Sequence, residues 1–404
     1  MKILFVHNNF PGQYRHIAGA LARNRKNELV AIGSSTARPF AGVRLLKYDM
    51  RNVDVSTSHP FARRFELESY RAEHVLYALS SLAESGFKPD AILAHPGWGE
   101  TLPLRTVFPA ARIMLYCEFF YGKEGRDVGF DPEFSDVGTD GHIALHLKNA
   151  ATLLALTESD ICVSPTAWQR STFPAEYQCK IRTIHDGIDV DQVKPNPDAV
   201  FRLPSGRRLR RSNEVVTFVA RNLEPLRGYH VFMRALPRIL AKRPRAQVVV
   251  IGGDGVSYGA APPRGQTWKQ RFLDEISEHT DTERIHFAGR LPYAEYLHAL
   301  QISSAHVYLT YPFVLSWSML EALSAGCTVI GSDTSPVREL IDGRNGFLVP
   351  FFDKAELAER VIEALSHPAR FRSVRKKARQ TILDRYDLHR ICLPKMMDLL
   401  EAER

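Results

Sequence analysis

The feature that most constrains the fold is an alternation of short apolar runs with segments of helical periodicity, repeated in two successive series. The first series contains the runs KILFVH, NELVAIG, DAILAH, RIMLYC, DICVSP and CKIRTIH, and the second contains EVVTFVA, AQVVVIGG, RIHFAG, AHVYLTY and CTVIGSD. Strands that alternate with helices at this rhythm form βα units and parallel sheets. The sequence therefore predicts an α/β protein.

Both series begin with a similar unit, which indicates two domains. Residues 3–21 and residues 216–236 each read as a strand, a polar loop containing a glycine (Gly12 or Gly228) and an amphipathic helix that ends in Ala-Leu. A chain of 404 residues also exceeds what one hydrophobic core usually holds. We therefore predict two Rossmann-like domains whose parallel sheets face an inter-domain cleft, with a boundary in the Pro-rich, charged segment 194–206.

Composition excludes several classes of protein. No stretch approaches the ~20 consecutive apolar residues of a membrane-spanning helix, and the N-terminal apolar run is too short for a secretory signal. The five cysteines, odd in number and without metal-ligand spacing, indicate reduced cytosolic thiols. The net charge of +8 favours anionic partners such as nucleotide phosphates or a lipid surface, although a solvated basic surface explains it equally. The densest basic run, 202–212, lacks a nucleic-acid-binding motif, so we interpret it as a linker or hairpin and predict no nucleic-acid partner.

Two motifs of the second series suit a nucleotide diphosphate. In ARNLEPLRG, Arg221 and Arg227 flank a loop that follows a strand, and their guanidinium groups match diphosphate oxygens, although the pair also reads as ordinary surface arginines. In VVVIGGDG, Gly252 and Gly253 allow close backbone approach to a ligand, or only a tight turn. The spacing matches neither the dinucleotide fingerprint nor a P-loop, which argues against a nicotinamide-dependent dehydrogenase, a kinase and an ATPase.

A single carboxylate, Glu321, lies inside the apolar run YPFVLSWSMLEALSAG. Ser318 and Glu321 fit a capping box, with Ser318 as the N-cap of a helix and Glu321 three residues later. A helix start behind a polar loop also attracts phosphate through its free N–H groups and its dipole. A carboxylate in that first turn can accept hydrogen bonds from ribose hydroxyls, so Glu321 has a structural and a ligand-binding interpretation.

Polar residues also follow strands of the first series. Glu118 comes directly after RIMLYC. His95 ends another strand ahead of a glycine-containing loop, and it suits either a sugar contact or a buried structural role. Asp186 and Gly187 form a turn signal after the last strand. The loop behind Glu118 suits an acceptor site or a cation, but acidic runs are more often only solvated and no EF-hand pattern is present, so we predict no metal site; its acids are Glu124, Asp127, Asp131, Glu133, Asp136 and Asp140.

Together these motifs resemble those of the large family 4 of retaining, GT-B-fold glycosyltransferases. The resemblance covers nearly the whole chain and is strongest from about residue 183 to residue 350. Each match is weak alone, but their order and spacing predict the family and its fold. The matching segments are DGID at 186–189, Arg221 with Arg227-Gly228, GGDG at 252–255, GRL at 289–291, EALSAGCTV at 321–329 and ELIDGRNGFLV at 339–349.

The resemblance implies a donor site. Arg221 and Arg227 would hold the donor diphosphate, and Glu321 would bind the donor ribose. Such enzymes commonly work without a metal because arginines and a helix N-terminus stabilise the departing diphosphate, so no cofactor is expected. The other residues assigned to the donor site are Gly12 beside the donor sugar, the backbone N–H groups of Leu315, Ser316 and Trp317 at the distal phosphate, Arg290 and Leu291 against the base, and His95, Asp186, Gly187, Gly252 and Gly253.

Two departures from the family pattern concern the sugar. The family usually has Glu-x7-Glu, whose first Glu contacts the donor sugar, but Phe313 stands eight residues before Glu321. The family's His-Asp pair is replaced by Cys-Glu-Phe at 117–119. We hypothesise that Glu118 acts as a base toward the acceptor hydroxyl or stabilises an oxocarbenium-like centre. The predicted catalytic residues are Glu118, Arg221, Arg227 and Glu321.

The sequence thus predicts a cytoplasmic glycosyltransferase that moves a hexose-type sugar from a UDP- or GDP-linked donor to a hydroxyl of a glycan, glycolipid or protein, with retention implied by the family. Its basic charge is compatible with peripheral contact at the inner face of an anionic membrane. The amphipathic last segment crosses back in this fold, so the domains would be residues 1–195 plus about 385–404, and residues 196–384. The alternatives are a GT-B-fold sugar-nucleotide epimerase, against which Phe313 weighs, and a non-catalytic sugar-nucleotide-binding module, which the missing Glu supports.

Overall fold

The computed structural model describes residues 1–134 and 137–402; Asp136 of the acidic loop lies outside them. The described residues fall into two compact units. Unit 1 comprises residues 1–128, 137–187 and 389–402, and unit 2 comprises residues 129–134 and 188–388. The chain therefore passes from one unit to the other between residues 187 and 188 and again between residues 388 and 389. The domain boundaries expected from the sequence, at about residues 195 and 385, remain a prediction. No helix in the described part of the chain is long and apolar enough to cross a membrane.

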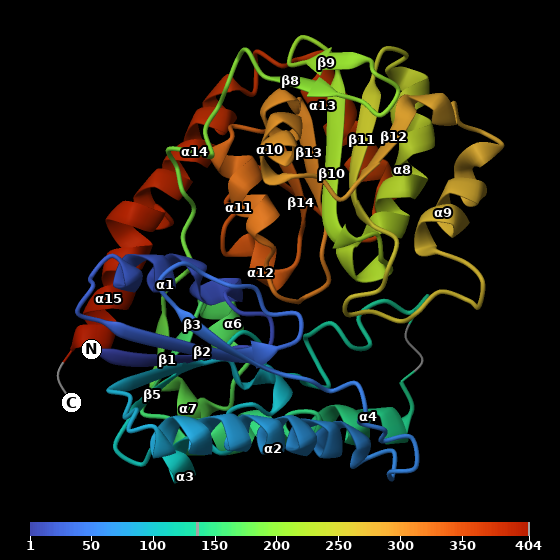
Figure 1. Cartoon of the computed structure of the whole chain (residues 1–404). Coiled ribbons are helices and arrows are strands. Elements are labelled where there is room, and N and C mark those ends of the chain that lie inside the picture. Colours follow the sequence, from blue (N-terminus) through green and yellow to red (C-terminus); the bar gives the residue numbers. More distant parts are fainter. Residues whose placement is uncertain (135–136, 403–404) are drawn as a thin grey trace. The chain divides into compact units, whose positions relative to one another are not determined.

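Unit 1 contains a parallel sheet with the strand order β3-β2-β1-β4-β5-β6-β7 (Figure 1). Every strand except β3 coincides with an apolar run of the first series. The sequence did not predict β3 because most side chains of this edge strand are exposed or half-buried. The strands are β1 (Lys2–Val6), β2 (Glu28–Ser34), β3 (Arg44–Tyr48), β4 (Ala91–Ala94), β5 (Arg112–Tyr116), β6 (Ile161–Ser164) and β7 (Ile181–Thr183).

Helices of unit 1 include the C-terminal helix α15, which packs against α1. Leu400 of α15 is buried in the same core as Ile17 and Leu21 of α1, and the Arg112 guanidinium donates to the Ala402 carbonyl at 2.7 Å. The helices are α1 (Arg15–Ala22), α2 (Arg63–Glu84), α3 (Leu104–Val107), α4 (Thr139–Leu147), α5 (Ala150–Glu158), α6 (Ala167–Ser171), α7 (Ala175–Gln178) and α15 (Leu393–Glu401), with 3-10 turns η1 (Gly12–Tyr14) and η2 (Pro96–Trp98).

Unit 2 contains a second parallel sheet, with the order β12-β11-β10-β13-β14-β15, and an antiparallel hairpin β8-β9 whose turn and second strand lie in the basic run. The short strand β15 has no counterpart among the predicted runs. The strands are β8 (Val200–Arg202), β9 (Arg208–Arg210), β10 (Val215–Asn222), β11 (Gln247–Gly253), β12 (Ile285–Gly289), β13 (Ala305–Tyr308), β14 (Val329–Ser332) and β15 (Phe347–Val349).

The helices of unit 2 form two groups, in which α8 packs with α9 and α13, whereas α11 packs with α10 and α14 (Figure 1). Phe218 of β10 stacks on Phe232 of α8, with ring centroids 4.7 Å apart. The helices are α8 (Tyr229–Lys242), α9 (Trp268–Ser277), α10 (Tyr293–Ile302), α11 (Trp317–Ser324), α12 (Ser335–Arg338), α13 (Lys354–Ser366) and α14 (Arg372–Arg385), with the turns η3 (Pro225–Arg227) and η4 (Thr282–Arg284) and the π-helical turn η5 (Leu388–Cys392), which enters unit 1.

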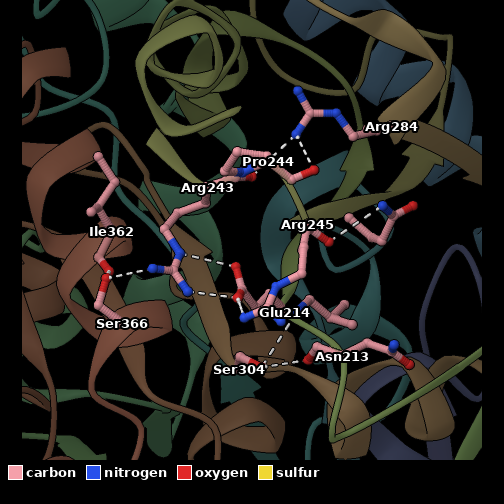
Figure 2. A network of polar contacts seen from close by, with 11 residues as sticks. Asn213, Glu214, Arg243, Pro244, Arg245, Arg284, Ser304, Ile362 and Ser366 are labelled. Carbon is pink, nitrogen blue, oxygen red and sulfur yellow. Dashed lines mark hydrogen bonds and ion pairs between the residues drawn. The ribbon is translucent and has the colours of Figure 1, made fainter. Parts of the chain in front are cut away.

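An arginine–carboxylate network ties the amino end of β10 to the ends of α8 and α13 (Figure 2). Glu214 receives a two-pronged contact from Arg243, at 2.6 and 3.0 Å, and a further one from Arg245 at 3.3 Å. Arg243 also donates to the Ser366 hydroxyl at 3.1 Å. Every group in this network has a partner, and the network lies at the edge of the sheet opposite the carboxyl ends of the strands, so its role is structural.

The strand orders position the functional groups. The strand that comes first in the chain within each parallel sheet, β1 or β10, lies in the interior of that sheet, and the strand order reverses beside it. Ligands of doubly wound sheets bind at the carboxyl ends of the strands next to such a switch point. The loops that follow β1, β4 and β5 in unit 1, and β10 and β13 in unit 2, are therefore where ligand contacts are expected.

Candidate functional site

Two buried histidines lie at the carboxyl edge of the unit 1 sheet. His7 follows β1 and is 2% exposed, and His95 follows β4 and is 4% exposed. Nδ1 of His7 accepts the backbone N–H of Asn9 at 2.9 Å, and Nδ1 of His95 accepts that of Gly97 at 3.1 Å. Since both Nδ1 atoms are acceptors, Nε2 is the ring nitrogen that can donate in each histidine.

Glycines make room for both rings. A Cβ on Gly12 would stand 2.6 Å from Cε1 of His7, and one on Gly97 would stand 2.8 Å from Cε1 of His95. Gly12 also has φ +44°, in the region that side chains disfavour. The structure thus gives Gly12, predicted to lie beside the donor sugar, a definite neighbour in His7.

A hydrogen-bonded chain runs from His7 to Glu118. Nε2 of His7 donates to Oε1 of Gln13 at 2.7 Å, which orients the amide so that Nε2 of Gln13 donates to Oε1 of Glu118 at 3.0 Å. Nε2 of His95 lies 3.6 Å from the other carboxylate oxygen. The Glu118 side chain remains 27% exposed, so the carboxylate is held from within and still faces solvent.

This environment fixes the charge of Glu118. Burial alone raises its pKa, but the contacts with His95, His7 and Gln13 outweigh burial, and the net effect lowers the pKa. Burial lowers the pKa of His7 to about 4, helped by the nearby His95 and opposed by Gln13 and Glu118. At neutral pH the group is therefore an ionised carboxylate beside a neutral His7.

Asp186 and Gly187 occupy the turn after β7. The Tyr116 hydroxyl donates to Oδ2 of Asp186 at 3.0 Å, and Gly187 donates its N–H to Nδ1 of His185 at 3.0 Å. The His95 ring stacks on Tyr116, with centroids 5.7 Å apart. The structure thus brings His95, Glu118 and Asp186 into one polar cluster of unit 1.

In unit 2, the two predicted arginines differ sharply. Nη1 of Arg227 donates to Oγ1 of Thr310 and to the carbonyl of Val314, both at 2.9 Å, and the guanidinium lies 5.6 Å from the centroid of the Phe313 ring. Arg221 is exposed, and the hydrogen bond described for its side chain is a long one of 3.4 Å to the Tyr258 hydroxyl. Arg227 is thus fixed by the protein, and Arg221 is held loosely.

The predicted capping box is wrong. The helix α11 begins at Trp317, and its N-cap is Ser316, whose Oγ accepts the Ser318 N–H at 3.3 Å. Because the helix starts two residues earlier than expected, Ser318 lies inside it and Glu321 falls in the second turn, where a side chain cannot reach back to the N-cap backbone.

Glu321 is instead held by two tyrosines. Oε1 accepts the Tyr293 hydroxyl at 2.7 Å, and Oε2 accepts the Tyr296 hydroxyl at 2.6 Å. The residue is 8% exposed. Each carboxylate oxygen has a second lone pair, so the tyrosines orient Glu321 and leave acceptor capacity for ribose hydroxyls.

Several backbone donors at the start of α11 are engaged within the protein, among them the Ser318 N–H described above. Ser316 donates its N–H to the Tyr308 oxygen at 2.8 Å, and Tyr308 also receives Nη1 of Arg227 at 3.4 Å. Tyr308 thus links Arg227 to the helix that carries Glu321. Leu315 is buried in the hydrophobic core, and Trp317 is the first residue of the helix.

The glycines after β11 accommodate protein groups. A Cβ on Gly252 would stand 2.7 Å from the Ala220 carbonyl oxygen, and one on Gly253 would stand 2.6 Å from Oδ1 of Asn222. Arg290, which is exposed, donates to that same Asn222 oxygen at 3.1 Å. Leu291 packs against the core. These contacts join the carboxyl ends of β10, β11 and β12.

Sequence reasoning missed three residues that build these sites. His7 and Gln13 support Glu118, and the rule that singled out Glu118 and His95, a polar residue at a strand end, would also have found His7. Glu224 is 1% exposed, and its Oε2 accepts the backbone N–H groups of residues 257–259 at 3.1–3.3 Å. It therefore fastens the loop after β11 to the loop that carries the arginines, and only its place between Arg221 and Arg227 hinted at this.

Part of the acidic loop serves unit 2. Asp131, which is 2% exposed, accepts the Tyr311 hydroxyl at 2.6 Å and lies 3.1 Å from Nε2 of His230. Glu133 forms a two-pronged pair with Arg234 at 2.6 and 2.8 Å. Within residues 1–134 and 137–402, no group of three or more His, Cys, Asp and Glu side chains is arranged to hold a metal ion.

Comparison with known proteins identifies both halves of the chain. Residues 25–193 match a family model described as the glycosyl transferase family 4 group, and residues 205–381 match the glycosyl transferases group 1 model. A glycogen synthase of Mycobacterium tuberculosis is 26% identical over 226 residues, 56% of this chain and 49% of that protein. A phosphatidyl-myo-inositol mannosyltransferase of Mycobacterium leprae is 28% identical over 187 residues, 45% of this chain and 43% of that protein. The chain thus spans about half the length of the curated relatives it matches.

Solved structures share the fold at low identity. Sucrose-phosphate synthase from Thermosynechococcus elongatus superposes with a TM-score of 0.71 at 16% identity, covering 99% of this chain and 98% of that one. Anabaena HepE in complex with UDP superposes with a TM-score of 0.68 at 16% identity, covering all of both chains. Both units thus have the fold expected from the sequence, and the two family models together span most of the chain. The chain therefore belongs to the family 4-like glycosyltransferases of the GT-B fold.

Proposed function

We propose that the chain transfers a hexose-type sugar from a nucleotide-diphosphate donor to a hydroxyl acceptor, with retention at the anomeric carbon. The observation that carries the proposal is the linked set in unit 2, in which Arg227, Tyr308 and the start of the Glu321-bearing helix are joined by hydrogen bonds. The names of the relatives, a glycogen synthase and a mannosyltransferase, favour a hexose. HepE was solved with UDP and with UDP-glucose, which favours a UDP-linked donor.

The donor diphosphate is assigned to Arg227 and Arg221, and the donor ribose to Glu321. A fixed guanidinium stabilises the negative charge that develops on the departing diphosphate without reorganisation during the step. The loosely held Arg221 is suited to closing on the donor after it arrives. Gly252, Gly253, Arg290 and Leu291 are assigned to the base side, where Gly253 and Arg290 lie against Asn222. No metal enters this scheme.

The donor sugar lacks a side-chain acceptor at the position where the family has its first Glu. Phe313 is 2% exposed and packs between Arg227 and Tyr258, whose ring centroid is 5.0 Å away. Phe313 therefore orients Arg227, and recognition of the sugar falls to backbone groups and to Ser316 in the loop that precedes α11.

Glu118 is assigned to the positive charge that develops at the anomeric carbon. A general base works best when its pKa lies near the operating pH. The contacts that lower the Glu118 pKa make it a weak base but keep it ionised. Of its two hypothetical roles, stabilisation of an oxocarbenium-like centre therefore suits it better than proton removal from the acceptor hydroxyl.

Aromatic residues beside Glu118 favour a carbohydrate acceptor. Phe119 lies 5.2 Å from Tyr121 and 5.9 Å from Trp168 between ring centroids, and all three are half-buried. Half-exposed rings offer flat apolar surfaces to the C–H faces of sugars. A glycan or a glycolipid headgroup would fit this surface, with a protein as the third acceptor class. The cytoplasmic location and the peripheral membrane contact remain predictions.

The first experiment identifies the donor. The full chain would be screened by thermal shift against a panel of UDP- and GDP-linked sugars, since a ligand that binds the folded state raises its apparent stability. The stabilising donor would then be followed for consumption with and without glycan acceptors. Consumption supports a transferase, whereas binding without any turnover would support a non-catalytic module, and a changed sugar on an intact nucleotide would support an epimerase.

The second experiment tests Glu118. Glu118→Gln keeps the shape and removes the charge, and Glu124→Gln, an exposed acid of the same loop, is the matched control. We expect turnover to fall by about two orders of magnitude in the first variant, in keeping with the loss of a charge that acts in the transition state, and to stay normal in the second. Near-normal turnover of Glu118→Gln would remove its catalytic role.

A further inference from the structure

Unit 2 contains a second cationic feature, away from Arg227 and Glu321. A cavity of about 470 Å³ lies between one face of α14, the hairpin end at Arg211 and the glycine that follows α11. Its volume falls within the range of small-ligand sites, about 300–1,000 Å³. Its lining contains no acid, and the cations that line it are Arg211, Arg372, Arg375, Lys376 and Arg379.

The four cations of α14 share one helical face. Arg372, Arg375, Lys376 and Arg379 follow the i, i+3, i+4, i+7 spacing, which places them side by side. Like charges so placed repel one another. Burial lowers the pKa of Arg375, and the nearby Arg211 and Arg372 lower it further. Such crowding of positive charges lowers the stability of the folded chain. We therefore look for a function of the cluster other than stabilising the fold.

Two of the arginines, Arg211 and Arg379, are held by neutral carbonyl groups and not by carboxylates. Arg211 donates to the carbonyls of Gln301 at 3.0 Å and Gly326 at 3.1 Å. Arg379 donates to the carbonyls of Val190, Val193 and Ser324 at 2.9–3.1 Å. Carbonyl oxygens fix a guanidinium in place but do not cancel its charge. Asp191 and Asp387 are near enough to act on Arg379 electrostatically, yet no ion pair within 4.0 Å joins any of the five cations to a carboxylate of the described chain.

The Glu214 network differs from this cavity because it contains a carboxylate. There, Arg243 and Arg245 converge on one carboxylate in a fully partnered cluster (Figure 2). In the cavity no carboxylate plays this part, because carbonyl oxygens hold Arg211 and Arg379 and the lining contains no acid. A cluster of cations that lacks an anion within the protein is suited to an anion from outside, and guanidinium groups match phosphate oxygens in particular.

We propose that this cavity binds a phosphorylated ligand with at least two anionic groups. The distance along α14 from Arg372 to Arg379 is about 10 Å at 1.5 Å per residue, more than one phosphate spans. The cavity is distinct from the donor residues, because Gly326 follows the C-terminal end of α11 whereas Ser316 caps its start, about 15 Å away along the helix axis. A soluble diphosphate compound and a phosphorylated lipid headgroup both carry the required chemistry.

Two neighbouring lysines provide a site-specific test. Lys376 lines the cavity, whereas Lys377 is exposed on the same helix outside it. The full chain would be acetylated with a water-soluble reagent in increasing inorganic pyrophosphate, at ionic strength held constant with potassium chloride, and each lysine quantified by mass spectrometry. We expect the reactivity of Lys376 to fall about tenfold while Lys377 changes little, since a charged hydrogen bond shields the amine. The proposal would be overturned if both lysines were protected equally. It would also be overturned if neither lysine were protected by pyrophosphate or by the vesicles described below.

Variants and a second arm complete the design. Arg372→Gln, at an exposed position, should weaken pyrophosphate protection of Lys376 about tenfold without affecting the fold, and Lys377→Gln should leave calorimetric pyrophosphate binding unchanged. Full protection in Arg372→Gln would contradict the proposed site. Vesicles of phosphatidylcholine with and without cardiolipin, whose headgroup carries two phosphates, form the second arm. Protection by pyrophosphate supports a soluble ligand, and protection only by the cardiolipin vesicles supports a headgroup at the same site.

Discussion

Gln13 donates its side-chain amide to Glu118 at 3.0 Å, although 105 residues separate them in the chain. The amide orientation is set from behind by His7, whose Nε2 donates to the Gln13 oxygen. His7 is itself oriented by the backbone N–H of Asn9. A carboxylate at the end of β5 is thus positioned by the loop that follows β1, so its charge and direction depend on groups that never touch the substrate in our scheme.

Gln13 is therefore a positioning residue with a measurable signature. Gln13→Met removes the hydrogen bond but keeps the volume. A lost donor raises the pKa of the carboxylate, so the acid limb of the turnover profile should move to higher pH. Turnover itself should fall about tenfold, as expected for a lost hydrogen bond to a charged group. An unchanged pH profile, measured with the donor at saturation, would show that Gln13 only fills space.

Much of the fold follows from local pattern. Buried strands produce apolar runs long enough to be recognised, so the eleven predicted runs coincide with β1, β2, β4–β7 and β10–β14. The pattern fails where a strand is not buried or is very short. Of the five residues of β3 only the last is buried, and β15 is three residues long. Such strands form because their backbone groups make hydrogen bonds to a neighbouring strand. The pattern of their own side chains does not reveal this pairing.

The sequence singled out candidate site residues, but it did not predict their hydrogen-bond partners. Strand ends pointed to His95 and Glu118, whereas the capping box assigned Glu321 to the wrong partner. The spacing of Ser318 and Glu321 fits the motif, but Ser316 is also a good N-cap and starts the helix first. Tyr293 and Tyr296 then reach Glu321 from α10, a contact between helices that no spacing within the motif encodes.

Gly12 should be intolerant of a side chain for two separable reasons. Gly12 and Gly86 both have positive φ, at +44° and +83°, but nothing lies within 4 Å of a Cβ on Gly86. Gly86→Ala should cost about 1 kcal/mol of unfolding free energy for the backbone alone. Gly12→Ala should cost about 1–3 kcal/mol more because it displaces His7. Urea unfolding of both variants gives the difference, and equal losses would mean that the His7 ring moves aside freely.

Arg221 and Arg227 should separate donor binding from stability. Each Arg→Gln variant should weaken binding of the nucleotide diphosphate about tenfold, since each removes a charged contact to the diphosphate. Only Arg227→Gln should also lower the unfolding free energy, by about 1–3 kcal/mol, because only Arg227 is hydrogen-bonded to Thr310 and Val314. Calorimetric titration and urea unfolding would be run on both. A stable Arg227→Gln variant would contradict the structural part of its role.

Tyr296 should matter more to Glu321 than Tyr293 does. Both donate to the carboxylate, but Tyr296 is 9% exposed and Tyr293 is 37% exposed. Tyr296→Phe should cost about 1–3 kcal/mol, because it leaves a buried carboxylate oxygen without its donor. Water can replace the Tyr293 hydroxyl, so Tyr293→Phe should cost less than about 1 kcal/mol. The order of the two losses in urea unfolding tests this, and the reverse order would place the solvent-excluded side of Glu321 at Tyr293.

Acid should destabilise the chain through a buried histidine of β13. His306 is fully buried, and burial lowers its pKa to about 3 from an ordinary value of 6.5. Between these values the unfolded chain binds a proton at this residue and the folded chain does not, so the unfolding free energy falls as the pH falls from 6.5 toward 3.

His306→Asn isolates this contribution to stability. Its side chain is placed to reach the Thr217 hydroxyl, which lies 2.9 Å from Nδ1 of His306, but it does not titrate. Wild type should lose up to about 2 kcal/mol more than the variant between about pH 6.5 and pH 5. His7 and His185, whose pKa values burial lowers to about 4, titrate in both proteins and cancel in the difference. Parallel stability curves for the two proteins would mean that His306 accepts its proton without unfolding.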